Sequence, residues 1–298
     1  MNKSKLFDKL INDLRSKLHL LEDKPEETVE TTLKALWLTA SGMHISAEHA
    51  ADLPLPDLTE KQADLLSLFI ELRLNNKPLA HITGRQNFMG IELLSDNRAL
   101  IPRKETEILG RKAVEIANRI AYTKGKVKVI DVCCGSGNLG IAVAYNNKIS
   151  QVSSADISKE AVDLTQGNID FLKLKRRINV RQSDLLTGFE SNVFYTNTDL
   201  IICNPPYIQS SKVKKMDTEI ASNEPELAFD GGMLGIKIIQ KLIHEAPRFL
   251  INGGWLAFEV GVGQGQMISQ LCEKTRLFSQ IETVLDNSNN IRAILAQK

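Results

Sequence analysis

The sequence predicts a three-layer α/β fold with a mostly parallel, seven-stranded sheet, preceded by a small helical bundle. From Glu105 onward, helical patterns alternate with short runs of strand-forming residues, which is typical of a sheet covered by helices on both faces. The last two strand patterns are separated only by a short Asn-rich turn, Asp286–Asn290. They must therefore pair antiparallel, so that a carboxy-terminal hairpin closes the sheet.

Residues 1–76 are predicted to form the helical domain. Apolar residues recur at helical spacing over 6–21 and over 29–38, which indicates two amphipathic helices. A third helix is expected to open at Thr59, because Gln62, three residues later, completes a capping box. Three helices of this kind can bury their apolar faces against one another.

Residues 77–104 are predicted to be a β-hairpin linker between this domain and the α/β domain, residues 105–298. Short β patterns occur at 79–83 and 90–94, with glycines at the turn positions. Within the α/β domain the expected elements are helix 105–121, strand 127–132, helix 138–147, strand 151–156, helix 159–172, strands 178–183 and 199–203, helix 233–250, strand 254–260, helix 264–275, and strands near 278–285 and 291–296.

Composition excludes several classes of protein. A net charge of +1 with 24% charged residues gives no clustered basic surface for tight, nonspecific nucleic-acid binding. No window approaches 18 uncharged apolar residues, so we expect neither a signal peptide nor a membrane span, and a cytoplasmic location. The four cysteines show no CxxC spacing, and the five histidines form no cluster, so no metal site is expected.

The most informative motif is the tetrapeptide Asn204-Pro205-Pro206-Tyr207, which follows a strand pattern at 199–203. An amide nitrogen is a poor nucleophile because its lone pair is in resonance with the carbonyl. The Asn204 side-chain oxygen and the Pro205 carbonyl, on a residue without an N–H, can accept both hydrogens of a substrate amide, while Tyr207 flanks its plane. Such orientation supplies roughly 7–11 kcal/mol when the geometry is good. The motif predicts methyl transfer to nitrogen; its plainer interpretation is a turn followed by polyproline II.

A second motif predicts a cofactor site. The strand at 127–132 is followed by a glycine-rich turn at 133–137 and a helix start, where backbone can approach a ligand and the helix amino terminus favours an anion. Asp156 follows about twenty residues later, well placed for ribose hydroxyls, and Asp184 closes the next strand. Asp131 could orient the turn or meet the cofactor. The two later carboxylates could instead cap helices or face solvent at strand ends.

This order of residues favours S-adenosylmethionine over a nicotinamide cofactor. The turn lacks a full dinucleotide fingerprint, although Gly140 brings it close to one. A nicotinamide-dependent oxidoreductase or a noncatalytic nucleotide-binding module therefore stays as an alternative. A similar glycine run, 261–265, also opens a helix, but its place after the clamp favours a packing turn.

Several blocks of the sequence carry a family resemblance. They are Pro78–Gly84 with Phe88–Gly90, Leu100–Arg103 with Glu105–Glu107, the turn at 133–137, Asn204–Ile208, Asn223–Ala228 before Gly231–Gly232, and Glu259–Gly261 with Gln264. In this order they resemble the release-factor glutamine methyltransferase family, also known as PrmC or HemK. The resemblance implies a class I, Rossmann-like methyltransferase fold and S-adenosylmethionine as cofactor. It also implies release factors as protein substrates and N5-methylglutamine in their Gly-Gly-Gln loop as product.

The resemblance also assigns site residues. It implies that the helical domain docks the release factor and that Asn204, Pro205, Pro206 and Tyr207 hold the substrate glutamine. The residues expected at the cofactor are Asp131, Cys133, Cys134, Gly135, Ser136, Gly137, Asp156, Asp184, Leu185 and Asn204. Three departures stand out: Lys104 replaces a usual proline, Cys133 replaces a frequent glycine, and 286–292 replaces a glycine-containing turn.

The leading expectation is therefore an N5-glutamine methyltransferase that works by in-line displacement without a dedicated general base. We expect a monomer with no stable nucleic-acid binding. The turn with Cys133 resembles a sister family that methylates a glutamine of a large-subunit ribosomal protein. The same tetrapeptide also occurs in enzymes that methylate the exocyclic nitrogen of adenine after flipping the base. Both acceptors remain as alternatives.

Overall fold

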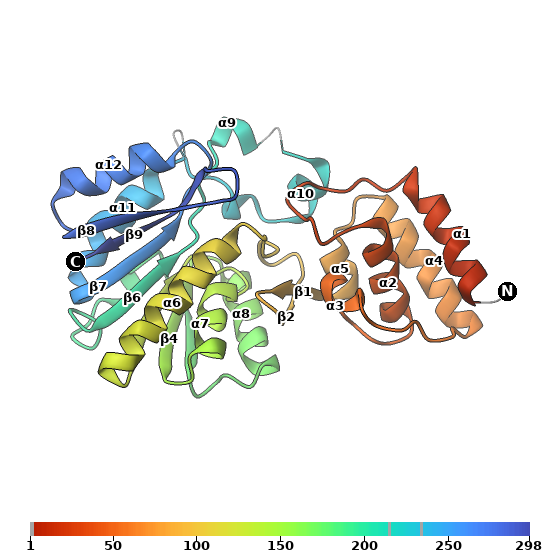
Figure 1. The fold of residues 1–298 in the computed structure, drawn as a ribbon, viewed down its shortest axis with the longest axis horizontal. Helices are drawn as coiled ribbons and strands as arrows, with labels where there is room; N and C mark the ends of the chain where they lie inside the picture. Colours follow the sequence, from red (N-terminus) through yellow and green to blue (C-terminus); the bar gives the residue numbers. More distant parts are fainter. Residues whose placement is uncertain (1–2, 214–215, 233–234) are drawn as a thin grey trace.

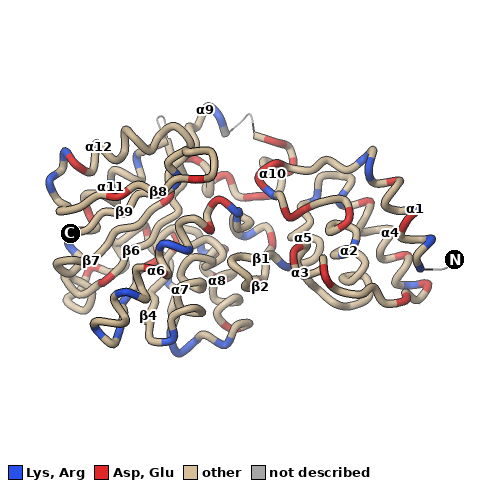
Figure 2. Tube along the Cα trace, viewed as in Figure 1, with Lys and Arg blue, Asp and Glu red and all other residues tan. Residues whose placement is uncertain are grey.

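The computed structural model describes residues 3–213, 216–232 and 235–298. Figure 1 shows an amino-terminal helical part and a larger α/β part, with a small hairpin between them. Charged residues of both signs are interspersed over the two parts (Figure 2). None of the helices in these described ranges has the length and apolar character that crossing a membrane requires.

The helical part is built around one buried helix. Its elements are α1 (Lys3–Arg15), α2 (Val29–Ala40), α3 (Ala47–Ala50), α4 (Glu60–Leu74) and α5 (Leu79–Thr83). On α2, Leu33, Leu36 and Trp37 are almost completely buried, and α1, α3, α4 and α5 pack around them. The capping box expected at Thr59 and Gln62 is confirmed, with a 2.9 Å bond from the Thr59 amide to Gln62 Oε1.

The first helix is shorter than expected, because α1 ends at Arg15 rather than near residue 21. The chain then runs without regular structure to the amino-terminal cap of α2 at Thr28. This irregular stretch carries Lys24 into a fully buried ion pair with Glu219. A tertiary contact of that kind overrides local helical periodicity, since burying a charge without its partner is costly.

The linker was predicted partly wrongly. Residues 79–83 are a helical turn, α5, rather than a strand. Pro78 precedes its first residue and Gly84 ends it in the left-handed conformation at φ +70°, so one short helix is closed at both ends. The hairpin instead pairs β1 (Arg85–Phe88) with β2 (Ile91–Leu94) in antiparallel register. The second expected strand, at 90–94, is thus confirmed, and the strand that pairs with it is 85–88 rather than 79–83.

The main sheet agrees with the sequence prediction. Its strands are β3 (Val127–Val132), β4 (Ser150–Asp156), β5 (Ile178–Gln182), β6 (Thr198–Cys203), β7 (Leu250–Glu259), β8 (Gln280–Leu285) and β9 (Ile291–Gln297). Within the described residues the order is β5-β4-β3-β6-β7-β9-β8. The first five strands run parallel, and β9 pairs antiparallel with both β7 and β8. The expected closing hairpin is confirmed.

Helices cover both faces of this sheet. The helices α6 (Thr106–Lys124), α7 (Asn138–Asn146) and α8 (Lys159–Phe171) pack on one face, and α11 (Lys237–Glu245) and α12 (Gly265–Thr275) pack on the other (Figure 1). The helix expected at 233–250 is shorter than predicted: residues 233–234 lie outside the described residues, and a 3₁₀ turn containing Pro247 follows α11 before β7 begins. Proline there cannot continue the helical hydrogen bonds.

Among the described residues between β6 and α11, two short α-helices were not predicted. They are α9 (Ser210–Val213) and α10 (Thr218–Asn223). Figure 1 shows α10 at the boundary between the two parts of the molecule. We call residues 216–229, which contain α10, the cover segment.

The sheet order positions the candidate site. The strand β3 has β4 on one side and β6 on the other. The strands β4 and β5 are therefore added on one side of β3, and the strands from β6 onward on the other side. Ligands of open α/β sheets bind at the carboxyl ends of strands at such a switch point. The glycine turn at 133–137 follows β3 and the clamp at 204–207 follows β6, so both motifs meet at this edge.

Candidate active site

The glycine turn is held by packing against α8. Gly137 has φ +83°, and a Cβ there would come within 2.8 Å of the Thr165 methyl group. The Thr165 hydroxyl donates to the Gly135 carbonyl at 2.8 Å. At Gly135, with φ +56°, a Cβ would meet nothing within 4 Å. Gly137 is therefore required by the fold, whereas Gly135 leaves open space for a ligand beside the backbone.

Asp156 connects the turn to the next helix. Its Oδ2 accepts from the Gly135 amide at 2.9 Å and its Oδ1 from the Ser158 amide at 3.0 Å. Ser158, rather than Asp156, is the amino-terminal cap of α8, so Asp156 fixes the turn and the capping residue without capping the helix itself. The same residue also lines the cavity in front of the turn. Burial raises the pKa of its carboxyl group, against the backbone amides of Ser158, Gly135 and Ile157, which lower it.

Asp131 lies behind the turn rather than in the cavity. It is fully buried at the end of β3, and its Oδ2 accepts from the Gly140 amide at 2.9 Å. A Cβ on Gly140 would approach that oxygen to 2.7 Å, so the third glycine allows α7 to pack closely on the sheet. Burial raises the pKa of Asp131 to about 7. The Gly140 amide belongs to α7, beyond the turn at 133–137, so the two roles considered for Asp131, orienting the turn or meeting the cofactor, stay predictions.

Two adjoining cavities open at this edge of the described chain. The first has a volume of about 180 Å³ and the second about 140 Å³. The predicted cofactor residues that line the first are Cys133, Cys134, Gly135, Ser136, Asp156, Asp184, Leu185 and Asn204. Asp184 lies at its exposed rim, where Oδ2 is 2.6 Å from Lys241 Nζ.

The first cavity suits a ligand such as S-adenosylmethionine. The amino terminus of α7 faces it through Ser136 and Asn138, and the Ser136 hydroxyl is buried without a partner among the described residues. Carboxylates at Asp156 and Asp184 can accept hydrogen bonds from hydroxyl or ammonium groups. Apolar side chains complete the wall; they are Leu139, Ile157, Leu185 and Ile238.

Asn204 stands where the two cavities meet, because it lines both. Its Nδ2 donates to Thr106 Oγ1 at 3.2 Å. This assignment of the amide follows from the hydrogen-bond network. It leaves Oδ1 without a partner in the described part of the chain, so that this oxygen can accept from a ligand. Pro206 lines the first cavity, and Pro205 and Tyr207 line the second. The structure thus brings the whole tetrapeptide to the junction.

Tyr207 is fixed at both its hydroxyl and its backbone. Its Oη donates to Glu259 Oε1 at 2.9 Å, and its carbonyl accepts from Gln264 Nε2 at 3.0 Å. The Gln264 side chain also accepts from the Gly261 amide at 3.0 Å, and a Cβ on Gly261 would lie 3.0 Å from the Tyr207 ring. Burial raises the pKa of Tyr207. The glycine run at 261–265 therefore packs behind the clamp, as its position in the sequence suggested.

The second cavity receives residues from both parts of the molecule. Asp23 comes from the helical part, and Met216, Ile220 and Phe229 come from the cover segment. Arg103 lines both cavities, with Nε 2.8 Å from Asp23 Oδ2 and Nη2 2.6 Å from Glu224 Oε1. This ion-paired arginine connects the helical part, the linker and the cover segment at the wall of the site.

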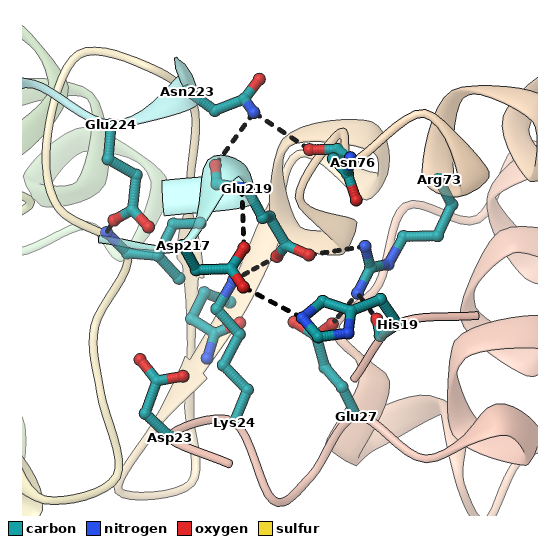
Figure 3. A network of polar contacts seen from close by, with 12 residues as sticks. His19, Asp23, Lys24, Glu27, Arg73, Asn76, Asp217, Glu219, Asn223 and Glu224 are labelled. Carbon is teal, nitrogen blue, oxygen red and sulfur yellow. Dashed lines mark hydrogen bonds and ion pairs between the residues drawn. The ribbon is translucent and has the colours of Figure 1, made fainter. Parts of the chain in front are cut away.

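A buried cluster behind that wall fixes the cover segment. Figure 3 shows Lys24 and Arg73 converging on Glu219 from the helical part. The Lys24 Nζ and Arg73 Nη1 atoms each lie 2.7 Å from a different oxygen of Glu219. Arg73 also reaches Glu27 at 3.2 Å, and Asn223 donates to the Asn76 carbonyl at 3.0 Å. Burial raises the pKa of Glu27 within this cluster, against Lys24 and Arg73, which lower it.

Several residues of the site were given no role by sequence reasoning. Thr106 and Glu259 lie in quoted sequence blocks, and both line the second cavity. Asp23 had no signal in the sequence, since its partner Arg103 is distant in the chain. Asp23 and Arg103 come together only in the folded chain.

The chain is similar in sequence to several named proteins. The family Methyltransferase small domain matches residues 116–236. The Thermodesulfovibrio yellowstonii protein named release factor glutamine methyltransferase is 31% identical over 243 residues, which cover 82% of this chain and 84% of that one. The chain belongs to the release factor glutamine methyltransferase family. Family members of the same name from Clostridium botulinum and Caulobacter vibrioides are 31% and 30% identical, over 81% and 82% of this chain and 83% and 82% of their own.

A solved structure supports the fold of this family member. The hMettl16 catalytic domain superposes with a TM-score of 0.52, at 12% identity, over 70% of this chain and 76% of that chain. With the sheet order above, this confirms the predicted class I methyltransferase fold, with a helical part added at the amino terminus.

The departures from the family pattern have local explanations. Cys133 occupies a left-handed conformation at φ +54°, which glycine adopts without strain. Lys104 forms ion pairs with Glu48 and, at 2.9 Å, with Glu107, so it connects α3 to α6. In the 286–292 turn Asn289 takes the left-handed conformation at φ 62°. Asparagine tolerates that conformation better than most residues.

Proposed function

We propose that this protein transfers a methyl group from S-adenosylmethionine to the side-chain amide nitrogen, N5, of the glutamine in the Gly-Gly-Gln loop of peptide chain release factors. Family membership supports the acceptor. The observation that carries the chemistry is the position of Asn204, which lines both cavities and keeps its side-chain oxygen available. A donor in one cavity and an acceptor in the other would meet at this side chain.

The first cavity would hold the cofactor. S-adenosylmethionine supplies an electrophilic methyl carbon attached to a sulfonium. The turn at 133–137 and the α7 amino terminus would bind the carboxylate, and Asp156 would accept from ribose hydroxyls. Asp184 and Leu185 line the same cavity and would contact the rest of the cofactor. Asp131 and Gly137 would act from behind by fixing the turn.

The second cavity would hold the glutamine side chain. Asn204 Oδ1 and the Pro205 carbonyl would each accept one amide hydrogen, so that the nitrogen lone pair faces the methyl carbon. Fixing the reacting groups in this way supplies roughly 7–11 kcal/mol when the geometry is good. Tyr207, held by Glu259 and Gln264, would flank the amide plane. No general base is needed, because the methylated amide nitrogen releases its proton readily after transfer.

The protein substrate would contact both parts of the molecule. We assign residues 1–76 to release-factor docking, 77–104 to the linker and 105–298 to catalysis. Asp23 from the docking domain already lines the second cavity, which supports a role for that domain close to the reacting group. The proposal implies a monomer that acts in the cytoplasm, where translation takes place.

The test is a methyl-transfer assay with isotope-labelled S-adenosylmethionine. A release factor, large-subunit ribosomal protein and DNA are offered in parallel. We expect label in the release factor and none in a variant whose Gly-Gly-Gln glutamine is replaced by alanine. Label in the ribosomal protein or in DNA alone would contradict the proposed acceptor, and absence of label from all three would contradict methyl transfer to these substrates.

A further inference from the structure

Glu259 is a buried acidic residue of the second cavity that the clamp alone does not explain. It is the last residue of β7, which pairs with the strand β6 that leads into the clamp, and it is 2% exposed. It lines the second cavity together with Asn204, Pro205 and Tyr207. A side chain in this position touches the space proposed for the substrate amide.

The two carboxylate oxygens of Glu259 differ in their surroundings. Oε1 accepts from the Tyr207 hydroxyl at 2.9 Å and lies 3.7 Å from Arg292 Nη2. Oε2 is buried and has no hydrogen-bond partner within the described residues. Burial raises the pKa of the Glu259 carboxyl group, against the Thr106 hydroxyl and Arg292, which lower it. Oε2 of Glu259 can therefore still accept a hydrogen bond, whereas a buried oxygen normally has a partner.

The charge around this cavity is predominantly negative. Among its described lining residues are the carboxylates Asp23, Glu105 and Glu259 and a single guanidinium, Arg103. The charge of Arg103 is matched by Asp23 and Glu224 at 2.8 and 2.6 Å. Within the described residues, the cation paired with Glu259 is Arg292, at the longer distance of 3.7 Å. A ligand in this cavity therefore meets an incompletely neutralised carboxylate.

We propose that Glu259 is a specificity-determining residue, whose negative charge makes the acceptor cavity accept an uncharged side-chain amide and reject the isosteric carboxylate. The inference rests on the proposed function and extends it to the discrimination of glutamine from glutamate. An uncharged amide, whose two hydrogens go to Asn204 and Pro205, adds no charge beside Oε2. A glutamate would place a second carboxylate against this buried one, and the two repel each other wherever both are ionised. Unfavourable contacts of this kind are a common source of specificity.

The test compares equilibrium binding of two release-factor forms, Gly-Gly-Gln and Gly-Gly-Glu, by calorimetry without cofactor. For the wild-type protein we expect the glutamate form to bind about a hundredfold more weakly, because close like charges cost several kcal/mol. In Glu259→Gln that ratio should fall to about tenfold or less, since the repelling charge is gone. Tyr207→Phe keeps the charge and should keep the discrimination. The exposed Glu273→Gln on α12, which makes the same charge change away from the cavities, should match the wild type.

The outcomes separate this inference from the proposed function. Equal wild-type affinity for the two forms would overturn the role of Glu259, and that comparison needs no variant. Unchanged discrimination in a folded Glu259→Gln protein, checked by its thermal unfolding and by S-adenosylhomocysteine binding, would overturn it as well. Methylation of the glutamine form by the wild type is measured alongside. If methylation fails, the proposed function fails; if it succeeds without discrimination, only the inference fails.

Discussion

Lys24 and Glu219 form an ion pair of 2.7 Å, from Nζ to Oε1, although 195 positions separate them in the chain. Their side chains are 1% and 0% exposed, and Arg73 binds the other oxygen of Glu219 (Figure 3). Because Glu219 lies in α10, this contact attaches the cover segment to the helical part. The wall of the second cavity therefore depends on residues far from it in sequence.

Replacing Glu219 with glutamine should destabilise the protein by about 3–5 kcal/mol, because Lys24 and Arg73 would remain buried with an uncompensated charge. Chemical denaturation measures this directly. Lys159→Met is the matched control, since Lys159 pairs with Asp163 at side-chain exposures of 60% and 51% and such pairs contribute about 0–1 kcal/mol. Similar losses in the two variants would contradict the importance of the buried cluster.

Asn204→Ala should reduce the turnover number by at least about a hundredfold, the loss that follows removal of one positioned hydrogen-bonding group at a reacting centre. Affinity for S-adenosylhomocysteine should stay largely intact, because the turn at 133–137 and Asp156 are unchanged. Single-turnover methylation and calorimetry measure the two quantities. A variant with the wild-type rate would show that the clamp does not hold the acceptor.

Thr106 should act on catalysis through Asn204. Thr106→Val removes the acceptor that orients the Asn204 amide, and losing one hydrogen bond of about 1 kcal/mol should lower the turnover number roughly fivefold to tenfold. Thr106→Ser keeps the hydroxyl and should restore most of the rate. A serine variant as slow as the valine variant would point to packing of the methyl group instead.

The buried carboxyl group of Asp131 should make stability depend on pH. Its pKa is raised from 3.8 to about 7 by burial, so the folded state binds the proton more tightly than the unfolded state. Its contribution is then fully present below about pH 4 and is lost as the pH rises to about 7. Between pH 5 and 7 the wild type should lose about 2–3 kcal/mol relative to Asp131→Asn, at 1.36 kcal/mol per unit.

Denaturation curves of both proteins at pH 5, 6 and 7 test this expectation. Asparagine keeps an oxygen for the Gly140 amide, so the variant isolates the charge. Other carboxyl groups with raised pKa values, such as Asp156 and Glu27, contribute to both proteins alike. Parallel pH dependence of the two proteins would show that Asp131 titrates normally.

The sequence was sufficient for the sheet because each strand is a short local pattern bounded by helices or turns. The pattern at 127–132 coincides with β3, and the closing hairpin follows from the shortness of the turn between the last two strands. It was insufficient at 79–83, where five residues fit either period and burial of Leu79 against α2 decides for a helix. The sequence did not predict α10, because the residues that contact this helix, above all Lys24 at Glu219, are distant from it in the chain.

For the site, residues beside a strand end were accessible to sequence reasoning and residues recruited from elsewhere were not. The glycine turn and the clamp directly follow β3 and β6, and Asp156 ends β4. Thr106 and Asp23 come from two other segments, and their positions follow only from how the helical part and α6 pack around the clamp. Glu259 is the exception, because it ends β7 and still received no role from the sequence.

The most direct test of the central claim is mass spectrometry of a release factor after incubation with the protein and S-adenosylmethionine. The account predicts that the Gly-Gly-Gln peptide gains one methyl group, that fragmentation locates it on the glutamine side chain, and that Asn204→Ala abolishes the gain. An unmodified peptide under conditions where the protein binds both the factor and S-adenosylhomocysteine would contradict it.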